Sequence, residues 1–158
     1  MNRMTMVKTG DTALTVTRRF NADPAAVFKA HTDEAIVRTW MLGPPGWTMP
    51  ECTLDATPGG AFSYTWAHPD EGSFTIHGTF LELDPPNRIF HEEVMEMGDE
   101  TPPAARVETR FEADPDGTLM TMTITYASAE QREAAVASGM EDGMAFSYDT
   151  LEKALASA

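Results

Sequence analysis

Residues 91–93 place a histidine beside two glutamates, and these side-chain types carry out acid–base chemistry. Successive side chains of a β-strand point to opposite faces, so either His91 and Glu93, or Glu92 alone, must point toward the interior. A carboxylate in an apolar cavity has a raised pKa and is able to act as a general acid or base. A bulge would change this assignment, and an edge strand would expose all three side chains to water. The sequence therefore indicates a candidate acid–base group without fixing which residue faces inward.

Other reactive residues are few and scattered. The four histidines stand at positions 31, 68, 77 and 91, and none has the spacing of a metal-binding motif. Cys52 is the single cysteine, so neither an intramolecular disulfide nor a thiolate cluster can form. The sequence contains no Ser-His-Asp order, nucleophile elbow, phosphate loop or dinucleotide fingerprint. We therefore expect no metal and no cofactor, and we leave open whether the protein is an enzyme.

Aromatic and methionine side chains provide a second kind of candidate site. Trp47 lies in a Pro/Gly-rich loop, which favours a position at the mouth of a cavity over a place in the core. Trp40 ends an amphipathic segment, so it either contacts a ligand or plugs an opening of the sheet. Eleven methionines are many for 158 residues. Because methionine is flexible and polarizable, these side chains either line a pliable pocket or fill an ordinary core.

Most of the chain has the pattern of β-strands. Residues 12–20 alternate apolar and polar side chains, with a polar break at Arg18. Asp23-Pro24 and Asp33 are N-cap signals for two short helices. Six further strand-like segments, separated by turn residues, are residues 51–56, 61–67, 73–83, 88–97, 106–113 and 119–126. Their short connections predict antiparallel pairing.

The C-terminal segment has the period of a helix. Apolar residues recur every three or four positions from Val136 to Leu155. Gly139 and Gly143 weaken helix propensity, so either the helix is kinked near Gly139 or the sheet approaches its backbone closely. The order strand, helix, helix, six strands, helix predicts one α+β domain over residues 1–158, with a curved antiparallel sheet around the long C-terminal helix and a loose segment at residues 1–11.

The composition limits the classes of partner. Eleven basic against 25 acidic residues give a formal charge of −14, which disfavours nucleic acid and membrane surfaces. The low cysteine content and the lack of a signal-like or membrane-spanning apolar run predict a cytoplasmic location. The sequence leaves open whether the protein is a monomer or a homodimer.

Several motifs, taken in order over roughly residues 13–155, resemble the polyketide cyclase and activator of Hsp90 ATPase homologue family of the START-like (SRPBCC) superfamily. The matching motifs are Phe20-Asn21-Ala22-Asp23-Pro24 with Val27-Phe28, Trp40 with Gly43-Pro44, Asp55 with Pro58-Gly59-Gly60, Gly78-Thr79-Phe80-Leu81-Glu82-Leu83 with Pro86-Asn87-Arg88-Ile89, Gly117-Thr118, Gly139-Met140-Glu141-Asp142-Gly143, and Tyr148-Asp149-Thr150-Leu151. The resemblance implies a helix-grip fold with a deep cavity between the sheet and the terminal helix. The short helices and the loop that carries Trp47 would roof this cavity.

The resemblance does not imply one function, because this fold hosts carriers, receptors, cyclases, hydrolases and co-chaperone domains. We expect non-catalytic binding of a small apolar or aromatic molecule; the alternatives are a cyclase or hydrolase using an acid–base residue, and a co-chaperone-like interaction module. The residues expected to line the cavity that the resemblance implies follow from strand parity, helix period and the position of the Trp47 loop, with the orientation of residues 91–93 still open; they are Trp40, Trp47, Phe62, Tyr64, Trp66, Phe74, Ile76, His91, Glu93, Met122, Ile124, Met140, Met144 and Tyr148.

Overall fold

The computed structural model describes residues 2–96 and 101–156, which form strands and four helices. The elements in chain order are β1 (Thr5–Thr9), β2 (Ala13–Phe20), α1 (Pro24–Thr32), α2 (Glu34–Trp40), β3 (Thr48–Leu54), β4 (Ala61–His68), β5 (Gly72–Asp84), β6 (Arg88–Glu96), β7 (Ala105–Asp114), β8 (Gly117–Thr125), α3 (Ala129–Ala137) and α4 (Met140–Ala156). In the described ranges, no helix is long and apolar enough to cross a membrane.

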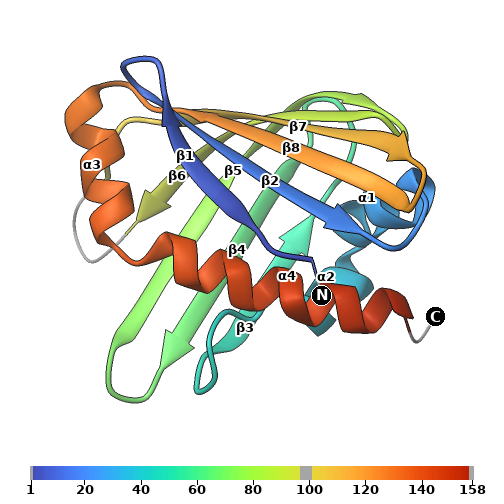
Figure 1. Ribbon diagram of the computed structural model, residues 1–158. Helices are drawn as coiled ribbons and strands as arrows, with labels where there is room; N and C mark the ends of the chain where they lie inside the picture. Colours follow the sequence, from blue (N-terminus) through green and yellow to red (C-terminus); the bar gives the residue numbers. More distant parts are fainter. Residues whose placement is uncertain (1, 97–100, 157–158) are drawn as a thin grey trace.

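The strands form one antiparallel sheet of order β1-β2-β8-β7-β6-β5-β4-β3. Figure 1 shows this sheet curving around α4, with α1 and α2 at one end of the molecule and α3 at the other. The predicted α+β helix-grip architecture is confirmed. One apolar face of an antiparallel sheet needs a cover, and α4 provides it.

The inner face of the sheet follows the predicted parity. β4 turns Phe62, Tyr64 and Trp66 inward, and all three side chains are buried. Their partners across the β4–β5 ladder are Gly78, Ile76 and Phe74. The other face carries the threonines, where Thr65 bonds Thr75 through their hydroxyl groups at 2.8 Å.

Both short helices begin where the sequence predicts. The carboxylate of Asp23 accepts a hydrogen bond from the amide of Ala26 at 2.8 Å, and Pro24 stands at the first helical position of α1. The carboxylate of Asp33 accepts from Ala35 at 3.0 Å and starts α2. These caps satisfy amide groups that have no partner within the helix.

The predicted C-terminal helix is divided into two. Ser138 closes α3, and Gly139 follows with a φ of +85°, a conformation that glycine adopts without strain. No atom of a neighbouring segment lies within 4 Å of the position that a Cβ would take at Gly139. Of the two alternatives the break is therefore correct, and close approach of the sheet is wrong.

The N-terminal segment differs from the prediction. Residues 1–11 were expected to be loose, but Thr5–Thr9 forms β1 and pairs with β2 along its whole length. Gly10, with a φ of +56°, helps the chain to turn back so that Met6 lies opposite Val16 and packs against the core. The segment contains too few apolar residues for its pattern to reveal a strand.

The edge strand β3 also begins earlier than predicted. It starts at Thr48, and its register with β4 is irregular between Thr48 and Glu51, around Pro50. Proline has no amide hydrogen to donate, so Pro50 cannot take part in a regular ladder. Residue 97, predicted to end the strand now seen as β6, lies outside the described residues.

A buried arginine connects the sheet to α4. Arg18 of β2 points inward with its side chain 1% exposed, and its Nη1 donates to the carboxylate of Asp149 at 2.7 Å. Its Nη2 lies 3.4 Å from the carboxylate of Glu152, which also accepts from Asn2. Arg18, which interrupts the apolar pattern of the strand, is thus the residue that forms an ion pair with α4.

This ion pair is asymmetric, which leads to a prediction. Arg18 is buried whereas the Asp149 side chain is 41% exposed, so only the arginine needs its partner to offset lost hydration. We expect D149N/E152Q to lower the free energy of unfolding by about 3 kcal/mol or more, because a buried charge then has no counter-charge. R18M removes the buried charge and should cost no more than about 1.5 kcal/mol. Urea denaturation of both variants tests this, and a larger loss in R18M would contradict it.

Candidate functional site

The β6 strand turns His91 and Glu93 toward the interior. Ile89, two positions earlier on the same face, is buried in the main core, and the His91 ring lies 5.2 Å from that of Phe62 on the inner face of β4. Glu92 points the other way. The structure thus selects one of the two orientations that the sequence left open.

His91 and Glu93 form a hydrogen-bonded pair. Nε2 of His91 lies 2.8 Å from Oε1 of Glu93, and the side chains are 16% and 25% exposed. A carboxylate oxygen accepts, so the proton belongs on Nε2. Nδ1 of His91 is buried with no hydrogen-bond partner among the described residues, and a second proton there would be left unpaired. The hydrogen on Nε2 of His91 therefore lies between the two side chains and orients the carboxylate of Glu93.

The negative charge of Glu93 contributes to the pKa of each of the three tyrosines of the chain. Burial raises the pKa of Tyr64, Tyr126 and Tyr148, and the nearby charge of Glu93 is a further cause for each. The three phenols therefore stay protonated at neutral pH. The hydroxyl of Tyr126 lies 3.6 Å from the sulfur of Met140. The part of the interior around Glu93 thus contains neutral groups that both donate and accept hydrogen bonds.

A continuous wall of rings extends from this pair across the inner face of the sheet. Neighbouring ring centroids along the wall lie between 5.1 and 5.9 Å apart, within the range of favourable aromatic contact. The members of this aromatic wall, in order, are His91, Phe62, Tyr64, Trp66, Phe74 and Trp47. Phe62, Tyr64 and Trp66 are buried, whereas Phe74 and the two ends, His91 and Trp47, are only half-buried.

The loop that carries Trp47 is held by two hydrogen bonds from outside it. Nε1 of Trp66 donates to the carbonyl oxygen of Met41 at 2.8 Å. The amide of Gly43 donates to the hydroxyl of Ser147 on α4 at 2.9 Å. Trp47 itself contacts His68 and Phe74. These bonds fix the loop between the sheet and α4.

Methionines contribute most of the remaining predicted site residues. Met122 of β8 and Met140 and Met144 of α4 are half-buried. Met144 packs against the main core, Met140 against a smaller cluster around Ile124, and Met122 against both. Ile76, also predicted, is half-buried beside Tyr64.

Two predicted site residues belong to the closed part of the core. Trp40 is 1% exposed, and its Nε1 donates to the carbonyl oxygen of Ala30 at 2.9 Å. Tyr148 stacks on Trp40 with ring centroids 5.6 Å apart. Of the two interpretations of Trp40, the structure favours the plug between the helices and the sheet.

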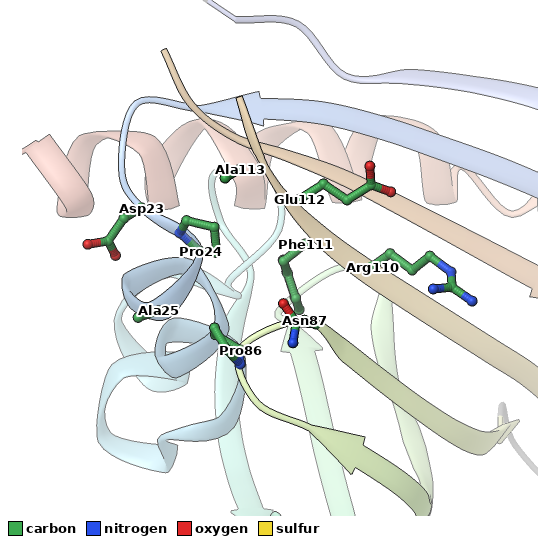
Figure 2. A pocket seen from close by; sticks show the side chains of 9 residues that line it. All are labelled: Asp23, Pro24, Ala25, Pro86, Asn87, Arg110, Phe111, Glu112 and Ala113. Atoms are coloured by element: carbon green, nitrogen blue, oxygen red, sulfur yellow. The ribbon is translucent and has the colours of Figure 1, made fainter. Parts of the chain in front are cut away.

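One pocket of the structure lies away from the residues predicted to line the cavity. It has a volume of about 580 Å³ and contains none of the predicted site residues; its lining is Asp23, Pro24, Ala25, Pro86, Asn87, Arg110, Phe111, Glu112 and Ala113. Figure 2 shows Pro24 and Ala25 of α1 on one side and Arg110 and Glu112 of β7 on the other. Except for Phe111 these side chains are largely on the surface, so the pocket is a shallow groove. Where a cavity was expected, the rings of the aromatic wall pack on one another.

The sequence analysis missed two residues near Glu93. Tyr126 was not selected, although it continues the inward parity of Met122 and Ile124 and packs in their cluster. Gly78 stands opposite Glu93 in the β5–β6 ladder, and a Cβ there would lie 1.8 Å from the carbonyl oxygen of Glu92. Only glycine permits this close approach of the two strands. Among the residues that the structure describes, no three His, Cys, Asp or Glu side chains are grouped so as to hold a metal ion.

Comparison with known proteins identifies the same family that the sequence motifs resemble. The family described as Activator of Hsp90 ATPase homolog 1-like protein matches residues 21–156. No curated protein matches the chain significantly.

Several solved structures have the same fold. A protein from Rhodobacter sphaeroides is 27% identical with a TM-score of 0.89, and the match covers 99% of each chain. A protein from Mycobacterium smegmatis is 23% identical with a TM-score of 0.86 and 96% of each chain covered. A protein from Nitrosomonas europaea is 20% identical with a TM-score of 0.82, covering 95% of this chain and 97% of the other.

The environment of His31, beside Trp40 and Tyr148, leads to a pH prediction. Burial lowers the pKa of His31 to about 4, although the hydrogen bond between its Nδ1 and the carbonyl oxygen of Val27 partly opposes this shift. The unfolded chain takes up this proton near pH 6.5 and the folded chain only near pH 4, so the associated stability is complete above pH 6.5 and lost as pH falls toward 4. We expect a loss of about 3 kcal/mol over this window.

Chemical denaturation across this pH range measures the effect in the wild type and in His31→Asn. Asparagine keeps a donor but does not titrate. The variant should lose less stability than the wild type as pH falls, and equal losses would contradict the prediction.

Proposed function

The chain belongs to the Activator of Hsp90 ATPase homolog 1-like family, and we propose that it binds a small apolar or aromatic molecule between the inner face of the sheet and α4 without converting it. Folds of this kind in general enclose a ligand. The observation that carries the proposal is the aromatic wall, whose two ends remain partly exposed. A planar molecule gains about 0.5–1.5 kcal/mol from each ring that it stacks on, beyond the area that it buries.

Three half-buried methionines give the packed interior a means to admit a molecule. Met122, Met140 and Met144 are half-buried, so they are not locked by neighbours on every side. Methionine has three rotatable bonds and repacks easily around different shapes. Binding would move these side chains away from the wall and leave the strands and the Arg18 ion pair in place.

A second candidate function is an enzyme of cyclase or hydrolase type, and the pairing of His91 with Glu93 favours it. A general acid or base must lie within hydrogen-bond reach of its substrate, and both side chains stand at one end of the aromatic wall. The two functions differ in the fate of the bound molecule. Its chemical structure, determined by mass spectrometry and NMR after extraction from the protein, stays the same for a binding protein and changes for an enzyme, where Glu93→Gln should stop the change.

Binding can be tested with N-phenyl-1-naphthylamine, an uncharged aromatic probe whose fluorescence rises in apolar surroundings. We expect saturable binding that Phe74→Ala weakens about tenfold, because Phe74 links Trp66 to Trp47 and a lost ring contact of about 1.4 kcal/mol corresponds to that factor.

Phe146→Ala is the matched control, since Phe146 lies on the exposed side of α4 with 46% of its surface accessible. The control should leave the affinity unchanged. Absence of binding, or an equal effect of both variants, would count against the proposed site.

A further inference from the structure

We propose that the molecule bound at this site is an organic cation, an amine carried on an apolar or aromatic body, whose charged group pairs with Glu93. This inference rests on the proposed function and identifies the chemical class of its ligand. It follows from the charges, hydrogen-bond capacity and rings that surround Glu93.

Glu93 carries a negative charge that the described side chains do not balance. Oε1 is occupied by His91, but the other carboxylate oxygen has no hydrogen-bond partner within residues 2–96 and 101–156. His91 orients the carboxylate through one oxygen, and no lysine or arginine among the described residues forms an ion pair with Glu93. A partly buried carboxylate of this kind favours a positively charged partner.

The basic residues near the interior are engaged elsewhere. Arg18 is the arginine on the inward side of the strands, and it pairs with Asp149 and Glu152 on α4. Arg88, in the same strand as Glu93, points to the outer face and pairs with Glu82 and Glu108. A ligand is therefore free to supply the counter-charge.

The neighbouring groups suit a cation better than an anion. Tyr64 belongs to the aromatic wall, and its neutral phenol oxygen is able to accept a hydrogen bond from an ammonium group. Phe62, Tyr64 and Trp66 belong to the same wall, and the faces of aromatic rings attract cations. A carboxylate in the same place would meet the like charge of Glu93 in a region of low dielectric.

Three probes with one naphthalene body separate charge from shape. They are 1-naphthylmethylamine, a cation at neutral pH; 1-naphthalenemethanol, which is uncharged; and 1-naphthoate, an anion. Isothermal titration calorimetry at low ionic strength should give an affinity for the amine about tenfold above that for the alcohol, with the naphthoate weakest. This series uses the wild-type protein, so it is decisive even if a variant fails to fold.

Two single substitutions then locate the effect. Glu93→Gln keeps the shape of the side chain and should weaken amine binding about tenfold while changing alcohol binding less than about threefold. Glu92→Gln removes the same charge from the same strand on its outer face. It should leave all three affinities unchanged, which controls for attraction of the amine by the overall charge of −14.

The outcomes distinguish this inference from the function on which it rests. Naphthoate or alcohol binding as tightly as the amine would overturn the cation preference and leave the binding function standing. Equal losses in Glu93→Gln and Glu92→Gln would also overturn it, because the preference would then come from the protein's total charge. Failure of all three probes to bind would overturn both proposals.

Discussion

The pairing of Arg18 with α4 determines how the two layers of the molecule meet. A buried guanidinium loses its hydration, and Arg18 recovers part of this loss from the hydrogen bond of Nη1 to Asp149 and the charge of Glu152 at 3.4 Å, while Nε and Nη2 have no hydrogen-bond partner among the described residues. Only one placement of α4 allows this, because both carboxylates lie on one side of the helix, three residues apart. The hydrophobic residues Tyr148 and Leu151 then point into the core. A directional polar contact thus orients a helix that apolar contacts alone would hold less specifically.

On the two sides of the Arg18 ion pair, the interior along α4 is packed to different degrees. Toward α1 and α2 the interior is closed by Trp40, Phe20 and Tyr148, which contact one another or their neighbours as buried rings. Toward α3 it is looser, with Met140 and Met144 half-buried. The two ends of the interior thus differ in packing, so a rearrangement of side chains at the looser end need not weaken the closed end.

The sequence predicted the parts of this structure that depend on local signals. Period-two patterns placed Phe62, Tyr64 and Trp66 inside, and the aspartates at 23 and 33 marked the helix starts. Contacts between distant segments were harder to infer. Strand β1 depends on its pairing with β2, in which Met6 lies opposite Val16. The burial of Arg18 depends on its ion pair with Asp149 of α4. The orientation of His91 and Glu93 depended on a bulge, which the structure places in β5, near Phe80 and Glu82. The cavity stays a prediction, because side-chain packing across the interior cannot be read from one strand at a time.

The irregular start of β3 has a consequence for how copies of the protein meet. β3 is an edge of an open sheet, and an edge with regularly spaced amide groups invites another strand to add to it. Pro50 offers no amide hydrogen, and the shift of register beside it bends the strand away from a flat ladder. At this edge the chain therefore resists intermolecular β-sheet growth, which protects it against aggregation at high concentration.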